Sequence, residues 1–198
     1  LTRTQDVKDV YENGALYGGL IFVENSKRCV SLRQAQELVT SAPLRFVGIF
    51  QNQEIDFIVK IASQLQLYAV QLHGSENAEF ITALRAKLPK SCQIWKAVSV
   101  NTDEKSAVNF EDDLNVARYV FDSQTAGQQG GTGKTFDWSL IPENLKHKII
   151  LAGGISPDNV EQAIQQGCLG VDVNSGVENS PGVKDHEKVR LIFEKIFS

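Results

Sequence analysis

The sequence contains few cysteines and no pattern that would pair them. Among its 198 residues only Cys29, Cys92 and Cys168 are cysteines, an odd number at wide spacing and without a CxxC pair. This usage argues against a disulfide framework or a zinc site and indicates a reducing compartment. No run reaches the length of about 18 apolar residues that a membrane span needs, and the opening letters LTRTQD lack signal-peptide character. We therefore expect a cytoplasmic protein with no membrane partner.

An excess of positive charge is also lacking. The chain has 20 Lys and Arg against 24 Asp and Glu, a formal net charge of -4, so it offers no general attraction to nucleic acid or anionic lipid. An anionic ligand would instead need a local arginine or a group of backbone N–H donors. No strand is followed by a Gly-rich dinucleotide fingerprint, which weakens the case for an open nucleotide-binding sheet.

Short apolar strands alternate with amphipathic helices along the whole chain. Seven predicted strands recur about every 25 residues, the spacing of βα units with short loops: Ala15–Val23, Leu44–Phe50, Leu67–His73, Gln93–Val100, Ala117–Asp122, Lys148–Ala152 and Leu169–Val173. This uniform repetition predicts one α/β domain over residues 1–198, and a (βα)8 TIM barrel more than an open doubly wound sheet. A helix comes before the first of these strands, so the eighth strand of such a barrel is missing and would lie before Leu1.

Two helix starts carry capping signals. Ser31 with Gln34 is a predicted capping box. Ser156-Pro157 places a capping hydroxyl before a proline at the first helical position. We expect helices to begin directly after Ser31 and Ser156.

Residues at the C-terminal ends of the strands carry the function of a barrel. The polar residues and glycines in these places are Arg28, Gln71, His73, Asp122, Gly153, Gly154, Asp172, Asn174 and Ser175. An Asp such as Asp122 is either an acid at the top of the barrel or a helix cap. Arg28 lies in a loop that either folds over the pocket or faces solvent, and His73 is either a packed histidine or a base.

The residues after the last two strands predict a phosphate site. Gly153 and Gly154 allow backbone N–H groups to approach a ligand closely. Asn174-Ser175 opens a predicted short helix whose N-terminus would face the same pocket. The alternative is a left-handed turn after one strand and an ordinary helix cap after the other.

A second Gly-rich stretch runs from Gly130 to Thr135. It fails the P-loop pattern, because that motif needs glycine where this sequence has Gln128. We expect a loop over the site in which Gly131 adds an N–H group to the phosphate. A plain surface loop is an equal alternative.

Taken together, these stretches resemble the phosphoribosylanthranilate isomerase family. The matching segments run in order through the chain and include LTRTQD, NSKRCVS, VQLHG, YVFDS, GGTGKTFDW, LAGGI and DVNSGVE. Several details are most similar to the isomerase half of a bacterial bifunctional protein, in which it is joined to an indole-3-glycerol-phosphate synthase. The resemblance therefore implies a TIM barrel with a fused synthase domain as partner.

The resemblance also implies a reaction. The family rearranges N-(5-phosphoribosyl)anthranilate to 1-(2-carboxyphenylamino)-1-deoxyribulose 5-phosphate in tryptophan biosynthesis, with no metal or organic cofactor. Asp122 matches the general acid that protonates the furanose ring oxygen, and Arg28 matches the arginine that holds the anthranilate carboxylate. His73 and Asp172 match positions near the sugar hydroxyls. The phosphate cradle is matched by Gly153, Gly154, Asn174 and Ser175.

One departure concerns the family's base, the cysteine of a K-x-C-G-L-T motif on the first strand. This sequence begins at the Leu of that motif, as Leu1-Thr2, so the expected catalytic cysteine is absent. Two other functions stay open. One is another sugar-phosphate isomerase on the same barrel, such as one of histidine biosynthesis. The other is a non-catalytic domain that binds phosphate ligands or serves as a scaffold.

Overall fold

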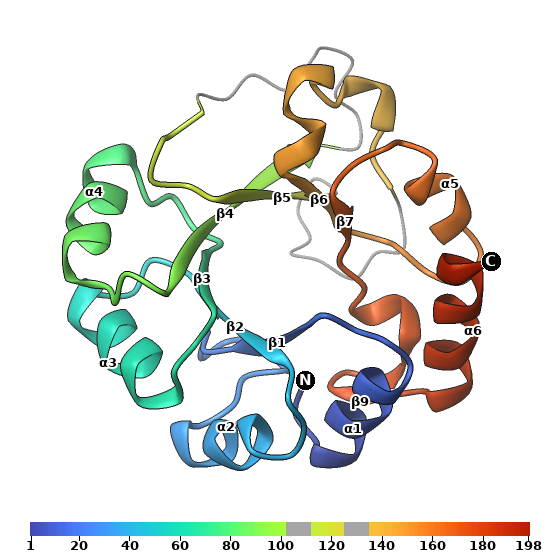
Figure 1. The fold of residues 1–198 in the computed structure, drawn as a ribbon, viewed down its shortest axis with the longest axis horizontal. Helices are drawn as coiled ribbons and strands as arrows, with labels where there is room; N and C mark the ends of the chain where they lie inside the picture. Colours follow the sequence, from blue (N-terminus) through green and yellow to red (C-terminus); the bar gives the residue numbers. More distant parts are fainter. Residues whose placement is uncertain (102–111, 125–134) are drawn as a thin grey trace. The chain divides into compact units, whose positions relative to one another are not determined.

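The computed structural model describes residues 1–101, 112–124 and 135–198 (Figure 1). The chain divides into two compact units. The N-terminal unit comprises Leu1–Lys96, Asp113–Ala117 and Asn179–Lys184, and the C-terminal unit comprises Ala97–Asp112, Arg118–Glu178 and Asp185–Ser198. A single domain over residues 1–198 stays a prediction.

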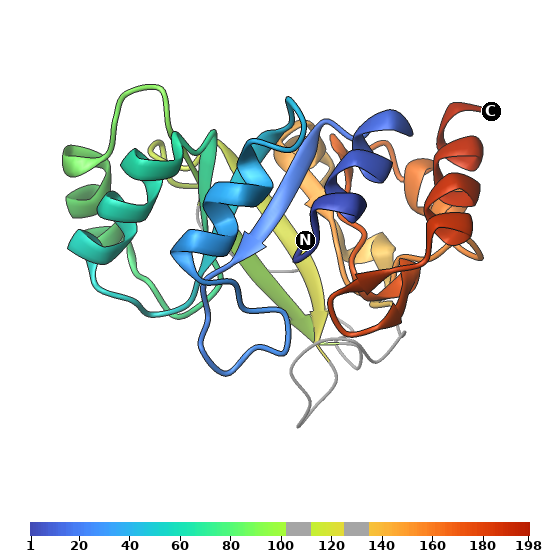
Figure 2. The same ribbon diagram turned by 90° about the horizontal axis from the view of Figure 1, so that it is seen from below.

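Parallel strands form the sheet of the N-terminal unit. They are β1 (Tyr17–Ile21), β2 (Arg45–Phe50), β3 (Ala69–Leu72) and the first half of β4 (Gln93–Asn101), paired in sequence order. The helices are α1 (Thr4–Glu12), α2 (Leu32–Val39), α3 (Ile55–Leu65) and α4 (Ala78–Lys87). Figure 1 shows α2, α3 and α4 along one side of these strands, and Figure 2 shows the arrows of β1 and β4 directed to the same edge. The loops after these strands therefore begin at one edge of the sheet.

The C-terminal unit continues the same repeat. Its sheet contains the second half of β4, then β5 (Arg118–Gln124), β6 (Ile149–Leu151) and β7 (Gly170–Val171). Its helices are α5 (Val160–Ile164) and α6 (His186–Phe197), with short 3₁₀ helices at η1 (Trp138–Leu140), η2 (Glu143–Lys148) and η3 (Ser175–Val177). Phe121, Ile149 and Leu151 on its strands are fully buried, as the apolar runs in the sequence predict for strands covered on both faces.

A small hairpin was not predicted from the sequence. β8 (Glu178–Ser180) and β9 (Val183–Lys184) pair as a separate two-stranded sheet. The hairpin is tied to α1, because the Lys184 N–H donates to Asp6 Oδ2 at 3.1 Å and the Thr2 hydroxyl donates to the Gly182 carbonyl. Strands of only two or three residues are too short to leave a period in the sequence.

The α/β class and all seven predicted strands are confirmed. In the described part of the chain the strands form one sheet in the order β1 to β7, which is TIM-barrel-like but not a closed eight-stranded barrel. Within the same residues no helix is long and apolar enough to cross a membrane.

The helix start predicted after Ser31 is confirmed, because α2 begins at Leu32, but the capping box and the start predicted after Ser156 need correction. The Ser31 hydroxyl accepts from the Gln34 N–H at 3.2 Å, but the Gln34 side chain donates to the Thr2 carbonyl instead of completing a capping box. The helix expected directly after Ser156 begins only at Val160. The Asn159 side chain accepts from the Ser156 N–H and donates to the Gly154 carbonyl, which holds the intervening residues in a turn.

Candidate active site

The end of β5 and the loop after β6 touch in the C-terminal unit. Asp122 lies within β5 and is half-buried, and Ser123 beside it is buried. Gly153, two residues beyond β6, has a φ of +77°. A Cβ added to Gly153 would overlap the Ser123 side chain and lie 2.7 Å from Asp122 Oδ1. The sequence therefore needs glycine at 153 for two reasons, the left-handed backbone and the close approach to Asp122.

The turn after β6 is held by its own side chains. Gly154 follows with a φ of +68°, so two successive residues adopt a conformation that favours glycine. The Asn159 amide binds the Gly154 carbonyl at 2.9 Å and the Ser156 N–H at 2.9 Å. The neutral Asn159 side chain thus fixes the backbone from Gly154 to Ser156, and further along the turn Lys195 Nζ of α6 donates to the Pro157 carbonyl at 2.8 Å.

The loop after β7 packs on the loop after β6. A Cβ added to Gly176 would overlap the Ile155 carbonyl oxygen, and the Asp172 N–H donates to the Leu151 carbonyl at 2.7 Å. Asp172 and Asn174 are exposed, and Ser175 is half-buried. Asp122, Gly153, Gly154 and the segment from Asp172 to Gly176 thus form one continuous group, which we call the glycine cluster.

The helix expected after Asn174 is reduced to a single turn. η3 contains only Ser175–Val177, and Glu178 then turns to extended backbone with φ −108° and ψ 150°. The Asn174 side chain makes no cap hydrogen bond to this turn. A helix dipole therefore adds little here, and the predicted phosphate site rests on the close-packed backbone of the glycine cluster.

Arg28 lies in a closed loop of the N-terminal unit. Its N–H donates to the Ser26 hydroxyl at 3.2 Å, and the Cys29 N–H donates to the Ser26 carbonyl at 3.0 Å. Arg28 is half-buried rather than fully exposed. The loop after β1 is therefore a folded turn that carries the guanidinium.

His73 follows directly after β3. It is half-buried, its N–H donates to the Phe50 carbonyl at 2.8 Å, and its Nδ1 lies 3.5 Å from Nε2 of Gln71. Gln71 is buried in the middle of β3. The side chains of Gln71, within β3, and His73, directly after it, therefore approach each other.

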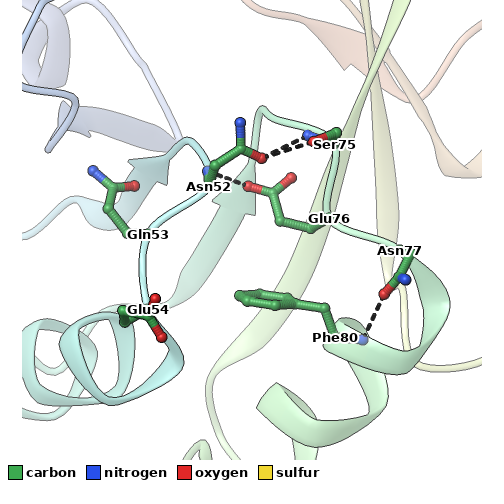
Figure 3. Close-up of a pocket in the computed structure, with 7 residues that line it drawn as sticks. All are labelled: Asn52, Gln53, Glu54, Ser75, Glu76, Asn77 and Phe80. Atoms are coloured by element: carbon green, nitrogen blue, oxygen red, sulfur yellow. Dashed lines mark hydrogen bonds between the residues drawn. The ribbon is translucent and has the colours of Figure 1, made fainter.

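A buried ion pair in the N-terminal unit was missed at the level of sequence. Lys96 Nζ lies 2.8 Å from Glu76 Oε2, with 16% of the Lys96 side chain and 1% of the Glu76 side chain exposed. Glu76 Oε1 also accepts from the Asn52 N–H at 2.8 Å, as Figure 3 shows. Burial alone would raise the pKa of Glu76, but the Lys96 hydrogen bond, backbone N–H donors and the Lys96 charge outweigh it and lower that pKa.

A pocket of about 350 Å³ lies beside this ion pair, between the loops after β2 and β3. Its lining residues are Asn52, Gln53, Glu54, Ser75, Glu76, Asn77 and Phe80. Asn52 Oδ1 accepts from the Ser75 N–H at 2.8 Å, and the Asn77 side chain caps α4 through the Phe80 N–H (Figure 3). Asn52, Ser75 and Glu76 thus join the two loops, whereas Asn77 serves as the cap of α4.

The structure groups the predicted site residues unit by unit. Asp122, Gly153, Gly154, Asn174 and Ser175 come together in the C-terminal unit with Asp172, while Arg28 and His73 belong to the N-terminal unit. Gly131 lies outside the described residues. In the described part of the chain no group of three or more His, Cys, Asp or Glu is placed to hold a metal ion.

None of the three cysteines has the character of a general base. Burial raises the pKa of Cys92 to about 11. Burial also raises the pKa values of Cys29 and Cys168, which are half-buried. Because the thiolate is the reactive form, the raised pKa values keep all three cysteines in the protonated, unreactive form near neutral pH.

Comparisons with known proteins include a family model that matches nearly the whole chain. A family model described as N-(5'phosphoribosyl)anthranilate (PRA) isomerase matches residues 1–195. The "Tryptophan biosynthesis protein TrpCF" of Haemophilus influenzae is 82% identical over 197 residues, which are 100% of this chain and 41% of that protein. The chain therefore spans less than half of that relative.

Solved structures with the same fold cover 98–100% of this chain. The crystal structure of phosphoribosyl anthranilate isomerase from Thermus thermophilus is similar with a TM-score of 0.85 at 26% identity, over 100% of this chain and 95% of that one. A second isomerase structure has a TM-score of 0.74 at 29% identity, over 98% of this chain and 94% of that one. That protein was solved in complex with reduced 1-(o-carboxyphenylamino)-1-deoxyribulose 5-phosphate.

Proposed function

The chain belongs to the N-(5′-phosphoribosyl)anthranilate isomerase family, and we propose that it catalyses the reaction of that family in tryptophan biosynthesis. The substrate is N-(5-phosphoribosyl)anthranilate, and the product is 1-(2-carboxyphenylamino)-1-deoxyribulose 5-phosphate. The observation that carries the proposal is the packing of Gly153 against Asp122. It sets a carboxyl group beside a glycine backbone turn, which suits an acid next to a phosphate cradle.

Asp122 is assigned as the general acid. In its protonated form it gives its proton to the furanose ring oxygen, the bond from C1′ to that oxygen breaks, and the amine nitrogen forms a Schiff base with C1′. Removal of the C2′ proton then gives an enolamine, which tautomerises to the ketone at C2′. We assign the removal of that proton to none of Cys29, Cys92 and Cys168, since their raised pKa values disfavour the thiolate.

The remaining predicted residues are assigned to binding. Arg28 is proposed to hold the anthranilate carboxylate, because a planar guanidinium binds a carboxylate through two hydrogen bonds. His73 and Asp172 are assigned to the sugar hydroxyls. The phosphate is assigned to the glycine cluster through Gly153, Gly154, Asn174 and Ser175, with Gly131 added on the basis of sequence.

The architecture and partner are proposed on the same basis. The seven described strands would correspond to seven of the eight strands of a (βα)8 barrel. We also propose that the chain works as one part of a bifunctional protein with an indole-3-glycerol-phosphate synthase, as its 82% identity to 41% of a TrpCF protein supports.

The test is an isomerase assay on the full-length protein with N-(5-phosphoribosyl)anthranilate, monitored by the change in anthranilate fluorescence. Conversion to the deoxyribulose product is expected. Tight binding of the reduced product without any turnover would favour a non-catalytic phosphate-ligand domain. Turnover of only a histidine-pathway phosphoribosyl substrate, offered in parallel, would favour the other sugar-phosphate isomerase.

A further inference from the structure

The backbone on both sides of His73 is held by one side chain. Lys96 Nζ donates to the Gly74 carbonyl at 2.6 Å and lies 3.5 Å from the Leu72 carbonyl. Leu72 and Lys96 are register partners in the pairing of β3 with β4, which brings the long Lys96 side chain to the point where β3 ends. The two carbonyls that flank His73 are therefore fixed by the same ammonium group.

Glu76 binds the backbone of the same segment through Gly74. Its Oε2 accepts from the Gly74 N–H at 2.9 Å and from Lys96 at 2.8 Å. Both backbone polar groups of Gly74 are thus bound by the ion pair. Because His73 also donates its own N–H to Phe50, the segment from Leu72 to Gly74 has little freedom to move.

Glu76 also binds the loop after β2, through the Asn52 N–H. Asn52 has a left-handed φ of 55°, and its N–H donates to Glu76 Oε1 at 2.8 Å. A Cβ added to Gly74 would lie 2.6 Å from Asn52 Cγ and 2.9 Å from Asn52 N. Gly74 is therefore required for this contact, and the loops after β2 and β3 are fixed as one body.

We propose that Lys96 and Glu76 are positioning residues for His73, acting through the backbone of residues 72–74; this rests on the proposed isomerase function. The physical reason is the location of a buried ion pair. Such a pair contributes little net stability compared with apolar packing, but it orients what it binds. Here it binds the backbone on either side of a predicted substrate-binding residue, and precise support of this kind is what a binding residue needs.

The test is a double-mutant cycle measured on the full-length protein. The variants are Lys96→Met, His73→Gln and the two combined, with Lys96→Arg as the conservative replacement. Lys87→Met is a matched control, because Lys87 Nζ also lies 2.8 Å from a carboxylate, that of Asp56, but in an exposed pair. Values of kcat and KM are measured at a temperature at which every variant is folded by circular dichroism.

Lys96→Met is expected to lower kcat/KM roughly 10- to 100-fold, since small misplacements of a binding group have effects of this size. Adding His73→Gln should then cause little further loss, and Lys96→Arg should recover part of the activity. Lys87→Met should leave kcat/KM unchanged, whether it is added to the wild type or to His73→Gln. A Lys96→Met enzyme with a lower melting temperature but unchanged kcat/KM would overturn the proposal, as would losses that simply multiply in the double variant.

A second variant and a second readout cover a Lys96→Met variant that does not fold and a wild-type protein without isomerase activity. If Lys96→Met does not fold, Glu76→Gln takes its place in the same cycle with the same expected non-additivity. If the wild-type protein has no isomerase activity, the proposed function fails by itself, and the imidazole nitrogen resonances of His73, assigned by their loss in His73→Gln, become the readout. A shift of these resonances in Lys96→Met but not in Lys87→Met supports positioning, and unchanged resonances in both overturn it.

Discussion

The loops after β2 and β3 and the loops after β6 and β7 are held in place by different kinds of contact. In the N-terminal unit, the Glu76 carboxylate and the Lys96 ammonium bind backbone groups of Asn52 and Gly74. In the C-terminal unit, the glycine cluster brings backbone against backbone, with no room for a Cβ at Gly153 or Gly176. The first region also has no room for a Cβ at Gly74, so it is organised by a buried ion pair together with close packing, whereas the second is organised mainly by close packing around its glycines.

This difference has a chemical reason. The Glu76 carboxylate already takes the N–H groups of Asn52 and Gly74, so the first region contains its own anion and is a poor place for a phosphate. Glycine backbone, by contrast, can approach a ligand anion closely. We therefore expect the N-terminal region to be sensitive to changes of charge, and the C-terminal region to changes of volume.

Asp122→Asn is the change in the glycine cluster that keeps volume and removes the acid. It should lower kcat about 10²- to 10⁴-fold, or about 3–5 kcal/mol of barrier, because a positioned general acid contributes that much. The melting temperature should hardly change, since Asn has nearly the same shape. Turnover near the wild-type value in an otherwise active enzyme would remove Asp122 from the mechanism.

Gly153→Ala tests volume directly, with Gly167→Ala as its control. Both glycines have positive φ, +77° and +69°, but a Cβ at 167 meets nothing within 4 Å. Gly167→Ala should cost about 1 kcal/mol for the left-handed backbone, whereas Gly153→Ala adds overlap with Ser123 and Asp122 and should cost about 2–5 kcal/mol. Urea unfolding at pH 7 measures both; equal losses would mean that the crowding at Gly153 relaxes without cost.

Lys96→Met tests charge in the N-terminal region. It leaves Glu76, whose side chain is 1% exposed, without its cation, and breaking a buried pair in this way costs about 3 kcal/mol. Lys87→Met removes an exposed pair and should change the unfolding free energy by no more than about 0.5 kcal/mol. Should the two variants unfold at the same urea concentration, the N-terminal region would not depend on the charge of the buried pair.

Much of the fold could be predicted from the sequence because each strand is an uninterrupted apolar run. Both ends of each strand from β1 to β7 lie within two residues of the ends predicted from its apolar run. For example, the sequence predicts a strand over Lys148–Ala152, and the structure has β6 over Ile149–Leu151. The same local logic selected Asp122 and Gly153 as candidate site residues, since a polar residue or a glycine stands out at the end of an apolar run. The hairpin of β8 and β9 and the late start of α5 escaped it, because both depend on side-chain hydrogen bonds of Asp6 and Asn159 to the backbone.

The ion pair of Lys96 and Glu76 could not be predicted from either residue alone. A lysine within IWKAV is ordinarily a surface residue of a strand, and Glu76 is ordinarily an acid near a helix start. The signal that pairs them is the register that sets Leu72 opposite Lys96, and register is a property of the folded sheet. The phosphate site, by contrast, was predicted with a feature that the fold lacks, because the helix expected after Asn174 is only a three-residue turn.

The smallest expected effect is a change of stability with pH that separates Glu76 from an exposed acid. The pKa of Glu76 is lowered in the folded protein, so its contribution to stability is fully present above the ordinary glutamate pKa of ~4.3. The contribution is lost as the pH falls below that value through the folded-state pKa. The unfolding free energy of the wild type minus that of Glu76→Gln should therefore be constant near neutral pH and shrink below about pH 4.3.

Asp112 is the matched control, an exposed acid whose pKa is lowered mainly by the Lys148 hydrogen bond. Asp112→Asn should therefore give a smaller change of the unfolding free energy with pH, and 1 M salt should reduce that change further. A difference for Glu76 that is the same at pH 3 and pH 7 would show that its carboxylate charge does not hold the N-terminal region together.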